Sequence, residues 1–357
     1  METEFRILDI LSREIGHSLS INKITEKVKA TYGSGDYKNI HVAMNNMAKN
    51  KMVKLEQTGN TSISSIDFEN YLIVDLLAEL ELKKKQEFLQ NKQEMQMLMM
   101  EIDTYFHRFL LIKSISLMNP ERNTKLNKIE LFIHLRKVDQ KLMDETKIAV
   151  YVLVDTLQKI HNIRIDYVLL EDKMFVNMLQ SIESNFTREM LSNKIVILNP
   201  QDFWLELKTM IMAGIKVVTE EKETNPAKIN EADLIFNLTR FGYTEFGPEI
   251  KQGKLICMEY VIAAIMFQND ARRMAAIPVI LAKNSDKINY DILLFLSRKY
   301  GFEGKMLGIL KTLRNQVVHG MKVIDEPIRL LESMKVEEIK ANEKSIKDML
   351  RLYHVTR

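Results

Sequence analysis

Cysteine, proline and glycine are all scarce in this sequence of 357 residues. The single cysteine, Cys257, excludes an intramolecular disulfide and is typical of a protein from a reducing compartment. Six prolines and 12 glycines leave few positions that break a helix, so we expect helix to predominate. No apolar run reaches about 18 residues and no basic-then-apolar leader follows Met1, so we expect a cytoplasmic protein without a membrane partner.

Neither positive nor negative side chains are in large excess. With 51 Lys and Arg against 48 Asp and Glu, the net charge is only +3, which excludes a chain that coats nucleic acid through a uniformly basic surface. Hydrophobic residues make up 46% of the chain and charged residues 28%, as in folded proteins. A chain of this length is expected to form two or three domains. Any nucleic-acid contact must therefore come from a local patch.

Residues 1–70 carry three helical patterns followed by a hairpin pattern. An apolar stripe over residues 5–15 predicts the first helix, and Ser20 is placed to cap the second. A third helix is expected over residues 37–52. Alternating segments on the two sides of Gly59 then predict a β-hairpin.

Three helices followed by a hairpin resemble the winged helix-turn-helix domain in length and order. The resemblance implies that the third helix reads a nucleic-acid groove while Ala43, Met44 and Met47 pack inward. Asn side chains recognise adenine, and Lys side chains contact phosphate or guanine. The candidate nucleic-acid-binding residues are Lys38, Asn39, His41, Asn45, Lys49 and Lys54. DNA is the expected partner and RNA an alternative; a protein-contact module is the other interpretation, because acidic and basic residues balance here.

The rest of the chain divides into three further segments. Residues 71–107 contain no proline or glycine and predict one long connecting helix, through which a homodimer could form although no heptad pattern is sustained. Residues 108–205 alternate strand and helix patterns and predict a small α/β domain. Residues 206–357 predict a C-terminal helical domain. The expected fold class is therefore α+β, mostly helical, with a winged helix, a small mixed sheet and a helical C-terminal domain.

The stretch from Phe109 to Leu135 predicts an apolar strand, a polar turn that starts at Ser114, and a second strand. Lys128 and Glu130 lie two positions apart on that second strand and therefore on one face of it. Asp166 lies on a further expected strand. Carboxylates that converge in this way are typical of sites that hold divalent metal ions.

This order resembles the archaeal-type nucleotidyltransferases over residues 109–170. In that family a Gly-Ser turn touches the phosphates, and three Asp hold two metal ions. Ser114 falls at the Ser, Lys128 at the first Asp, Glu130 at the second and Asp166 at the third. Because Lys113 and Lys128 replace a Gly and a metal ligand, the resemblance implies a degenerate, inactive transferase domain.

The favoured prediction is a DNA-binding, transcription-regulating protein whose transferase-like domain senses a ligand or binds a partner, with no cofactor expected. The alternative is an active transferase that modifies a protein or RNA hydroxyl. For that alternative the resemblance implies Ser114, Glu130 and Asp166 as catalytic residues, with Glu130 and Asp166 as metal ligands. Mg²⁺ and a nucleoside triphosphate would then be required.

Two stretches in the helical half carry further resemblances. The run from residue 270 is similar to the helical region of archaeal-type nucleotidyltransferases, which implies phosphate binding by Arg272 and Arg273; ordinary surface arginines are the alternative. The segment LRNQVVHG matches the Arg-Asn-x-x-x-His motif of HEPN domains. That match implies a ribonuclease or toxin–antitoxin component with Arg314 and His319 at its site, whereas a helix C-terminus that favours histidine is the simpler reading.

Overall fold

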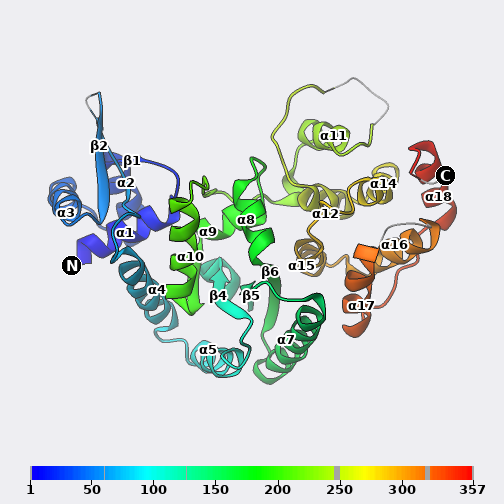
Figure 1. Ribbon diagram of the computed structural model, residues 1–357, viewed down its shortest axis with the longest axis horizontal. Coiled ribbons are helices and arrows are strands. Elements are labelled where there is room, and N and C mark those ends of the chain that lie inside the picture. The colour runs from blue at the N-terminus through cyan, green and yellow to red at the C-terminus, as the bar shows by residue number, and fades with distance from the viewer. Residues whose placement is uncertain (1, 60, 126, 245–249, 318–321, 356–357) are drawn as a thin grey trace.

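The computed structural model describes residues 2–59, 61–125, 127–244, 250–317 and 322–355. Across these residues the chain is α+β and mostly helical, with two small sheets, as expected. In Figure 1 the N-terminal elements lie at one end of the long axis, the C-terminal helices lie at the other, and the larger sheet lies between them. None of the described helices is both long and apolar enough to cross a membrane.

Residues 2–66 form three helices and a three-stranded sheet. In chain order the elements are α1 (Glu2–Arg13), β1 (Leu19–Ser20), α2 (Ile21–Tyr32), α3 (Tyr37–Lys49), β2 (Val53–Thr58) and β3 (Thr61–Ile66). The strands are antiparallel in the order β1-β3-β2. The expected helices and hairpin are confirmed, while the two-residue strand β1 was not expected.

Local chemistry explains where α2 and α3 begin. Ser20 Oγ accepts a hydrogen bond from the Lys23 N–H at 3.2 Å, and the Asp36 carboxylate accepts one from the Asn39 N–H at 3.1 Å. Each cap satisfies a backbone donor that the helix leaves open and contributes about 1 kcal/mol. The cap predicted at Ser20 is therefore confirmed.

Gly16 lets a distant segment approach the N-terminal elements. Its φ is +82°, and a Cβ at this position would lie 2.2 Å from the carbonyl oxygen of Val217. Beside it, the N–H of Thr219 donates to the carbonyl oxygen of Ile15 at 3.0 Å. Both the left-handed backbone and the close approach require glycine.

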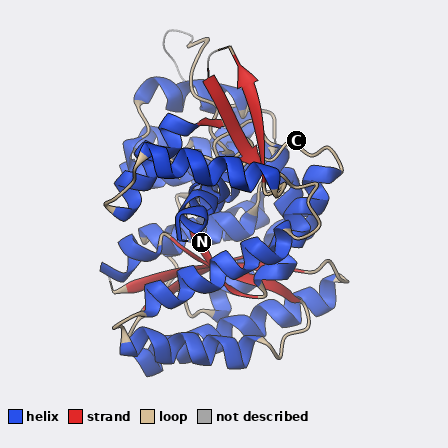
Figure 2. Ribbon diagram, turned by 90° about the vertical axis from the view of Figure 1, so that its left-hand side faces the viewer, coloured by secondary structure: helices blue, strands red, loops and turns tan. Residues whose placement is uncertain are grey.

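The larger sheet has four strands in the order β6-β5-β4-β7. They are β4 (Ile112–Met118), β5 (Lys128–Leu135), β6 (Arg164–Glu171) and β7 (Lys194–Leu198). Strands β5 and β6 run parallel, and β4 is antiparallel to both β5 and β7. The mixed sheet is thus as expected, and Figure 2 shows it well separated from the N-terminal sheet.

The polar turn expected from Ser114 is wrong. Ser114 lies inside β4 and is fully buried, and the strand continues to Met118. The connection to β5 contains a short helix, α6 (Pro120–Lys125). The alternating Ser-Ile-Ser-Leu sequence of β4 is a strand pattern with small polar residues on one face, and those serines were mistaken for a turn.

The remaining helices cover the sheet and make up the C-terminal half. They are α4 (Ile73–Leu89), α5 (Gln93–Phe106), α7 (Gln140–His161), α8 (Asp172–Gln180), α9 (Phe186–Ser192), α10 (Pro200–Met212), α11 (Glu231–Arg240), α12 (Met258–Gln268), α13 (Ala271–Met274), α14 (Ala276–Lys283), α15 (Tyr290–Tyr300), α16 (Glu303–Gln316), α17 (Asp325–Ser333) and α18 (Glu343–Leu352), with 3-10 turns at Pro226–Lys228 and Lys322–Ile324.

The expected continuous helix over residues 71–107 is also wrong, because it is divided into α4 and α5. Asn91 between them has a φ of 61°, a left-handed conformation that ends a right-handed helix. The apolar face of α4, which includes Leu77 and Leu80, is buried against α1, α10 and β7. The apolar residues on which the predicted homodimer depended are thus largely used within the chain, and the dimer stays a prediction.

Apolar side chains cover both faces of the larger sheet. On one face Ile115 and Leu131 pack with α5 and α7. On the other face Phe132 belongs to a continuous core that extends from Ile7 in α1 to Leu350 in α18. Polar side chains on this second face therefore lie inside the molecule.

Candidate functional site

The outer face of α3 carries the side chains predicted to contact nucleic acid. Ala43, Met44 and Met47 are buried together with Ile40, and α3 packs on α1 and α2, so the inward positions are confirmed. The side chains exposed on the other face are Tyr37, Lys38, Asn39, His41, Val42, Asn45, Asn46 and Lys49. This surface is mostly polar, with the apolar side chain of Val42 exposed within it.

The lysines of this surface differ in their surroundings. Within the described part of the chain, neither Lys38 nor Lys49 forms an ion pair. Lys54 on β2 instead lies 2.6 Å from a carboxylate oxygen of Glu69 and 3.7 Å from one of Asp67. The positive charge available to a partner therefore comes from the two ends of α3 rather than from the base of the hairpin.

Side chains in the middle of α3 are held together, and the hairpin projects beside them. Asn45 Nδ2 lies 3.2 Å from His41 Nδ1, and the ring of His41 lies 5.9 Å from that of Tyr37. The end of the hairpin, including Gln57 and Thr58, is exposed. Figure 1 shows this hairpin extending beyond the helices, next to α3.

Glu130 and Asp166 are brought together as predicted. They face each other in register on β5 and β6, and each has only 1% of its surface exposed. Lys128 Nζ lies 2.8 Å from Glu130 Oε1, and Lys299 Nζ of α15 lies 3.2 Å from the same atom. Arg164 Nε donates to Asp166 Oδ1 at 3.1 Å. Glu130 and one oxygen of Asp166, Oδ1, are thus paired with cations of the protein itself.

The charges around Glu130 reinforce one another. Burial disfavours its charged form, but Lys299 and Lys128 outweigh burial and hold the pKa of Glu130 below its usual value. Lys299 also lies 2.7 Å from Glu223, and the two carboxylates hold the pKa of Lys299 above its usual value despite its burial. These groups therefore form a charged network at neutral pH.

Ser114 is not brought to Glu130 and Asp166. It faces His134 across the β4–β5 pair, whereas Glu130 faces Met118. His134 and Glu130 are four positions apart on β5, which corresponds to about 13 Å along the strand. The three residues predicted for a transfer site are therefore divided between the two ends of the sheet.

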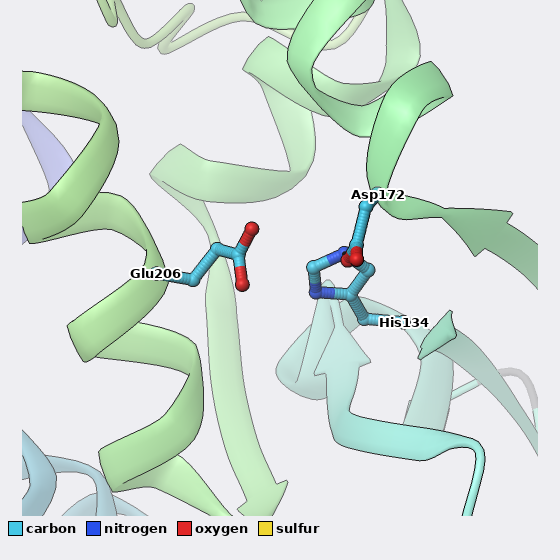
Figure 3. Close-up of side chains that lie close together, drawn as sticks. All are labelled: His134, Asp172 and Glu206. Atoms are coloured by element: carbon cyan, nitrogen blue, oxygen red, sulfur yellow. The ribbon is translucent and has the colours of Figure 1, made fainter. Parts of the chain in front are cut away.

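A second polar cluster lies at the His134 end of the sheet. His134 is near the end of β5, Asp172 begins α8 directly after β6, and Glu206 lies on α10. His134 Nε2 lies 3.0 Å from Asp172 Oδ1, and one donor atom from each of the three residues lies within 4.8 Å of the others. In Figure 3 the Glu206 carboxylate points toward the imidazole from one side, and the Asp172 carboxylate overlaps the ring in this view.

Lys113 on β4 completes this His134 cluster. Its Nζ lies 2.7 Å from Asp172 Oδ1 and also donates a hydrogen bond to Glu206. Burial disfavours the charged Asp172 carboxylate, but the neighbouring His134 and Lys113 outweigh burial and lower the pKa of Asp172 to about 2. His134 is 1% exposed, whereas the Asp172 side chain is 29% exposed, so the cluster is open to solvent on one side.

Sequence reasoning missed His134 and Glu206 as members of one site. His134 lies near the end of β5, Asp172 directly follows β6, and these two strands are parallel neighbours. Groups at the carboxyl ends of parallel neighbours meet at one edge of the sheet. That edge was the available signal for His134 and Asp172. Glu206 comes from a helix much later in the chain, and nothing in its sequence spacing indicated it.

The arginines predicted in the C-terminal half lie on other helices than the two clusters. On α13, Arg273 Nη2 lies 2.6 Å from Glu231 Oε1 of α11, and Arg272 is exposed. Arg314 is exposed on α16. His319 lies outside the described residues. Phosphate binding by the α13 arginines and the HEPN-like pair both stay predictions.

A cavity of about 700 Å³ lies between the N-terminal helices and the larger sheet, lined by α1, α2, α4 and β7. Arg13, Lys84 and Lys194 contribute cations to its wall. Asp9 Oδ2 lies 2.7 Å from Arg13 Nη2, and Asp9 Oδ1 lies 3.5 Å from Lys84 Nζ. Burial lowers the pKa of Lys194 to about 7. Glu14 and Glu221 also line the cavity, so it is polar and carries charges of both signs.

Comparison with known proteins gives no relative: no family model, curated protein or solved structure matches this chain. Its function has to be inferred from its own residues.

Proposed function

We propose that this protein binds duplex DNA through α3 and the β2–β3 hairpin, in the manner of a winged helix-turn-helix domain. The observation that carries the proposal is the outer face of α3, which is mostly polar and has a lysine at each end that forms no ion pair among the described residues. The order of helices and strands in residues 2–66 supports it, since that order is shared with winged helices.

The dimensions of α3 suit a major groove. Lys38 and Lys49 are 11 residues apart, which places them about 16 Å apart along the helix axis. A major groove is about 12 Å wide, so the two ammonium groups can reach phosphates on its two sides. Asn45 lies between them on the exposed face, where its amide can pair with an adenine edge. The lysines would position the helix, and Asn45 would read the sequence.

We further propose that the cavity between α1, α2, α4 and β7 binds a polar effector. A ligand there would contact both the N-terminal helices and the sheet. Its contacts would therefore depend on the position of these helices relative to the sheet. The charged network at Glu130 and Asp166 disfavours transfer chemistry, because cations of the protein already pair with Glu130 and with Asp166 Oδ1. In this account the sheet supports sensing rather than catalysis.

The test is a fluorescence anisotropy titration of a labelled duplex of mixed sequence, at low and at moderate salt. The full chain is expected to bind the duplex, and Lys38→Ala and Lys49→Ala are each expected to weaken binding several-fold. Lys159→Ala, which removes an exposed lysine of α7, is the matched control and should leave binding unchanged.

Two outcomes would overturn the proposal. One is the absence of salt-dependent binding to any duplex. The other is equal weakening in Lys38→Ala and in the Lys159→Ala control, because the contact would then be spread over the surface. An unlabelled single-stranded RNA that competes better than duplex DNA would reassign the partner to RNA.

A further inference from the structure

His134 is a buried histidine whose ring lacks the hydrogen bonds that such residues normally make. Its side chain is 1% exposed, and neither Nδ1 nor Nε2 has a hydrogen-bond partner among the described residues. The hydroxyl of Ser114, which faces it on β4, is also buried without a partner. Buried polar atoms are nearly always satisfied, so these atoms point to a group that binds there.

The neighbours of His134 are oxygen donors from separate elements. Asp172 Oδ1 lies 3.0 Å from His134 Nε2 and 2.7 Å from Lys113 Nζ, but neither contact has hydrogen-bond geometry. Glu206 approaches from α10, so that an imidazole and two carboxylates converge within 4.8 Å (Figure 3). Imidazole nitrogen and carboxylate oxygen are both donors that Zn²⁺ and related transition-metal ions take from proteins.

We propose that His134, Asp172 and Glu206 bind a divalent transition-metal ion of the Zn²⁺ or Mn²⁺ class. The imidazole favours such an ion over Mg²⁺ or Ca²⁺, which prefer oxygen ligands alone. Three protein ligands leave a coordination position open, and the partial exposure of Asp172 and Glu206 puts that position on the solvent side. The site is distinct from the carboxylates of Glu130 and Asp166, at the other end of the strands.

Lys113 explains how the same residues remain stable without the ion. Its ammonium contacts both carboxylates and supplies one of the two positive charges that they require. A divalent ion supplies both charges and also satisfies the His134 ring, so it should displace the ammonium. Because the Lys113 side chain is 16% exposed, its Nζ can move toward solvent when this happens. Metal ion and ammonium therefore compete for one place.

Only a small closure is needed to coordinate an ion. Bonds of about 2.1 Å in a tetrahedral site put the ligand atoms roughly 3.4 Å apart. The 3.0 Å between His134 Nε2 and Asp172 Oδ1 is already close to that value, and the 4.8 Å limit of the whole group exceeds it by little more than an ångström. The Glu206 side chain, 21% exposed on a helix surface, has the freedom to supply this movement.

The test is a titration of the chelator-treated full chain with Co²⁺ and Zn²⁺, followed by the visible absorption of bound Co²⁺ and by calorimetry. One ion is expected to bind per chain. Glu206→Gln should lower the affinity at least tenfold, because it removes a charged ligand with little change in shape. Lys113→Met should raise the affinity at least tenfold, because it removes the competing cation. Asp202→Asn, which changes an exposed acid of the same helix, is the control and should bind like the unchanged chain.

The Lys113→Met variant keeps the test decisive even if loss of a ligand disturbs folding. Absence of Co²⁺ binding in both the unchanged chain and Lys113→Met would overturn the proposal. Binding of equal strength in Glu206→Gln and Asp202→Asn would also overturn it, since the ion would then lie elsewhere. None of these measurements involves nucleic acid, so the proposed metal site and the proposed DNA-binding surface are tested independently of each other.

Discussion

Glu130 and Asp166 face each other in register on two parallel strands, yet they pair with different cations. Lys128 and Lys299 hold Glu130, and Arg164 holds Asp166. Two carboxylates at this spacing would otherwise repel each other in a buried site and attract a metal ion. The cations remove both tendencies, which supports a structural use of this end of the sheet.

Removal of the Glu130 charge should therefore lower the stability of the folded chain. In Glu130→Gln, Lys128 and Lys299 lose a carboxylate that is 1% exposed, and Lys299 itself is 7% exposed. Breaking a buried pair from one side costs about 3 kcal/mol, because the partner charge remains buried. We expect a fall of that order in the free energy of unfolding, measured by urea denaturation at pH 7.

Asp155→Asn provides the comparison for this variant. It breaks an ion pair with Lys159 that lies on the surface of α7, where exposed pairs contribute little. The account predicts no measurable change for Asp155→Asn. If Glu130→Gln were equally harmless, the network around Glu130 would not contribute to stability.

A buried acid should make stability fall between weakly acidic and neutral pH. Burial raises the pKa of Glu189 from 4.5 to about 7, although Thr224 N–H and Tyr260 Oη–H both donate to it. Because the folded state holds its proton more tightly, the stabilisation is complete below pH 4.5 and is lost as pH rises through 7. The loss amounts to at most about 3 kcal/mol.

Glu189→Gln should abolish this loss, because an amide keeps the uncharged form at every pH. The difference in unfolding free energy between the variant and the unchanged chain should grow between pH 5 and pH 8, measured by denaturant titration at each pH. Glu145→Gln, at an exposed position of α7, should show no such trend. A difference that stays constant with pH would show that Glu189 is already ionised in the folded chain at pH 5.

Gly308 on α16 should tolerate no side chain. A Cβ there would lie 2.0 Å from the carbonyl oxygen of Ile339, whose own N–H donates to Gly304 O at 3.0 Å. Gly308→Ala must push this segment off the helix, and such overpacking costs about 1–3 kcal/mol. Asn315→Ala, at an exposed position of the same helix, should have little effect. A thermal unfolding series that ranks the two variants the other way round would contradict this packing.

The N-terminal elements were predictable because their signals are local. Ser20 caps the helix that it was expected to cap, and Ala43, Met44 and Met47 point inward as their helical spacing predicts. A cap and an apolar stripe each depend on residues within a turn or two of one another. The hairpin around Gly59 is predictable for the same reason.

The larger sheet shows where local signals are insufficient. The serines of β4 look like turn residues until the fold places them opposite His134 and Phe132 of β5. Likewise Asn91 interrupts a segment that has no proline or glycine, because an asparagine can adopt the left-handed conformation. The partners of Glu130 and His134 include Lys299 and Glu206, which the sequence places far away.

The central claim is that α3 is the surface that contacts nucleic acid. The most direct measurement is the slope of the logarithm of the duplex DNA binding constant against the logarithm of salt concentration, for the unchanged chain and for Lys38→Ala/Lys49→Ala. Each lost phosphate contact should make the slope shallower by about 0.9, so the double variant should differ by about two. Identical slopes, with both proteins folded, would contradict the account, because the lysines at the ends of α3 would then not touch the DNA.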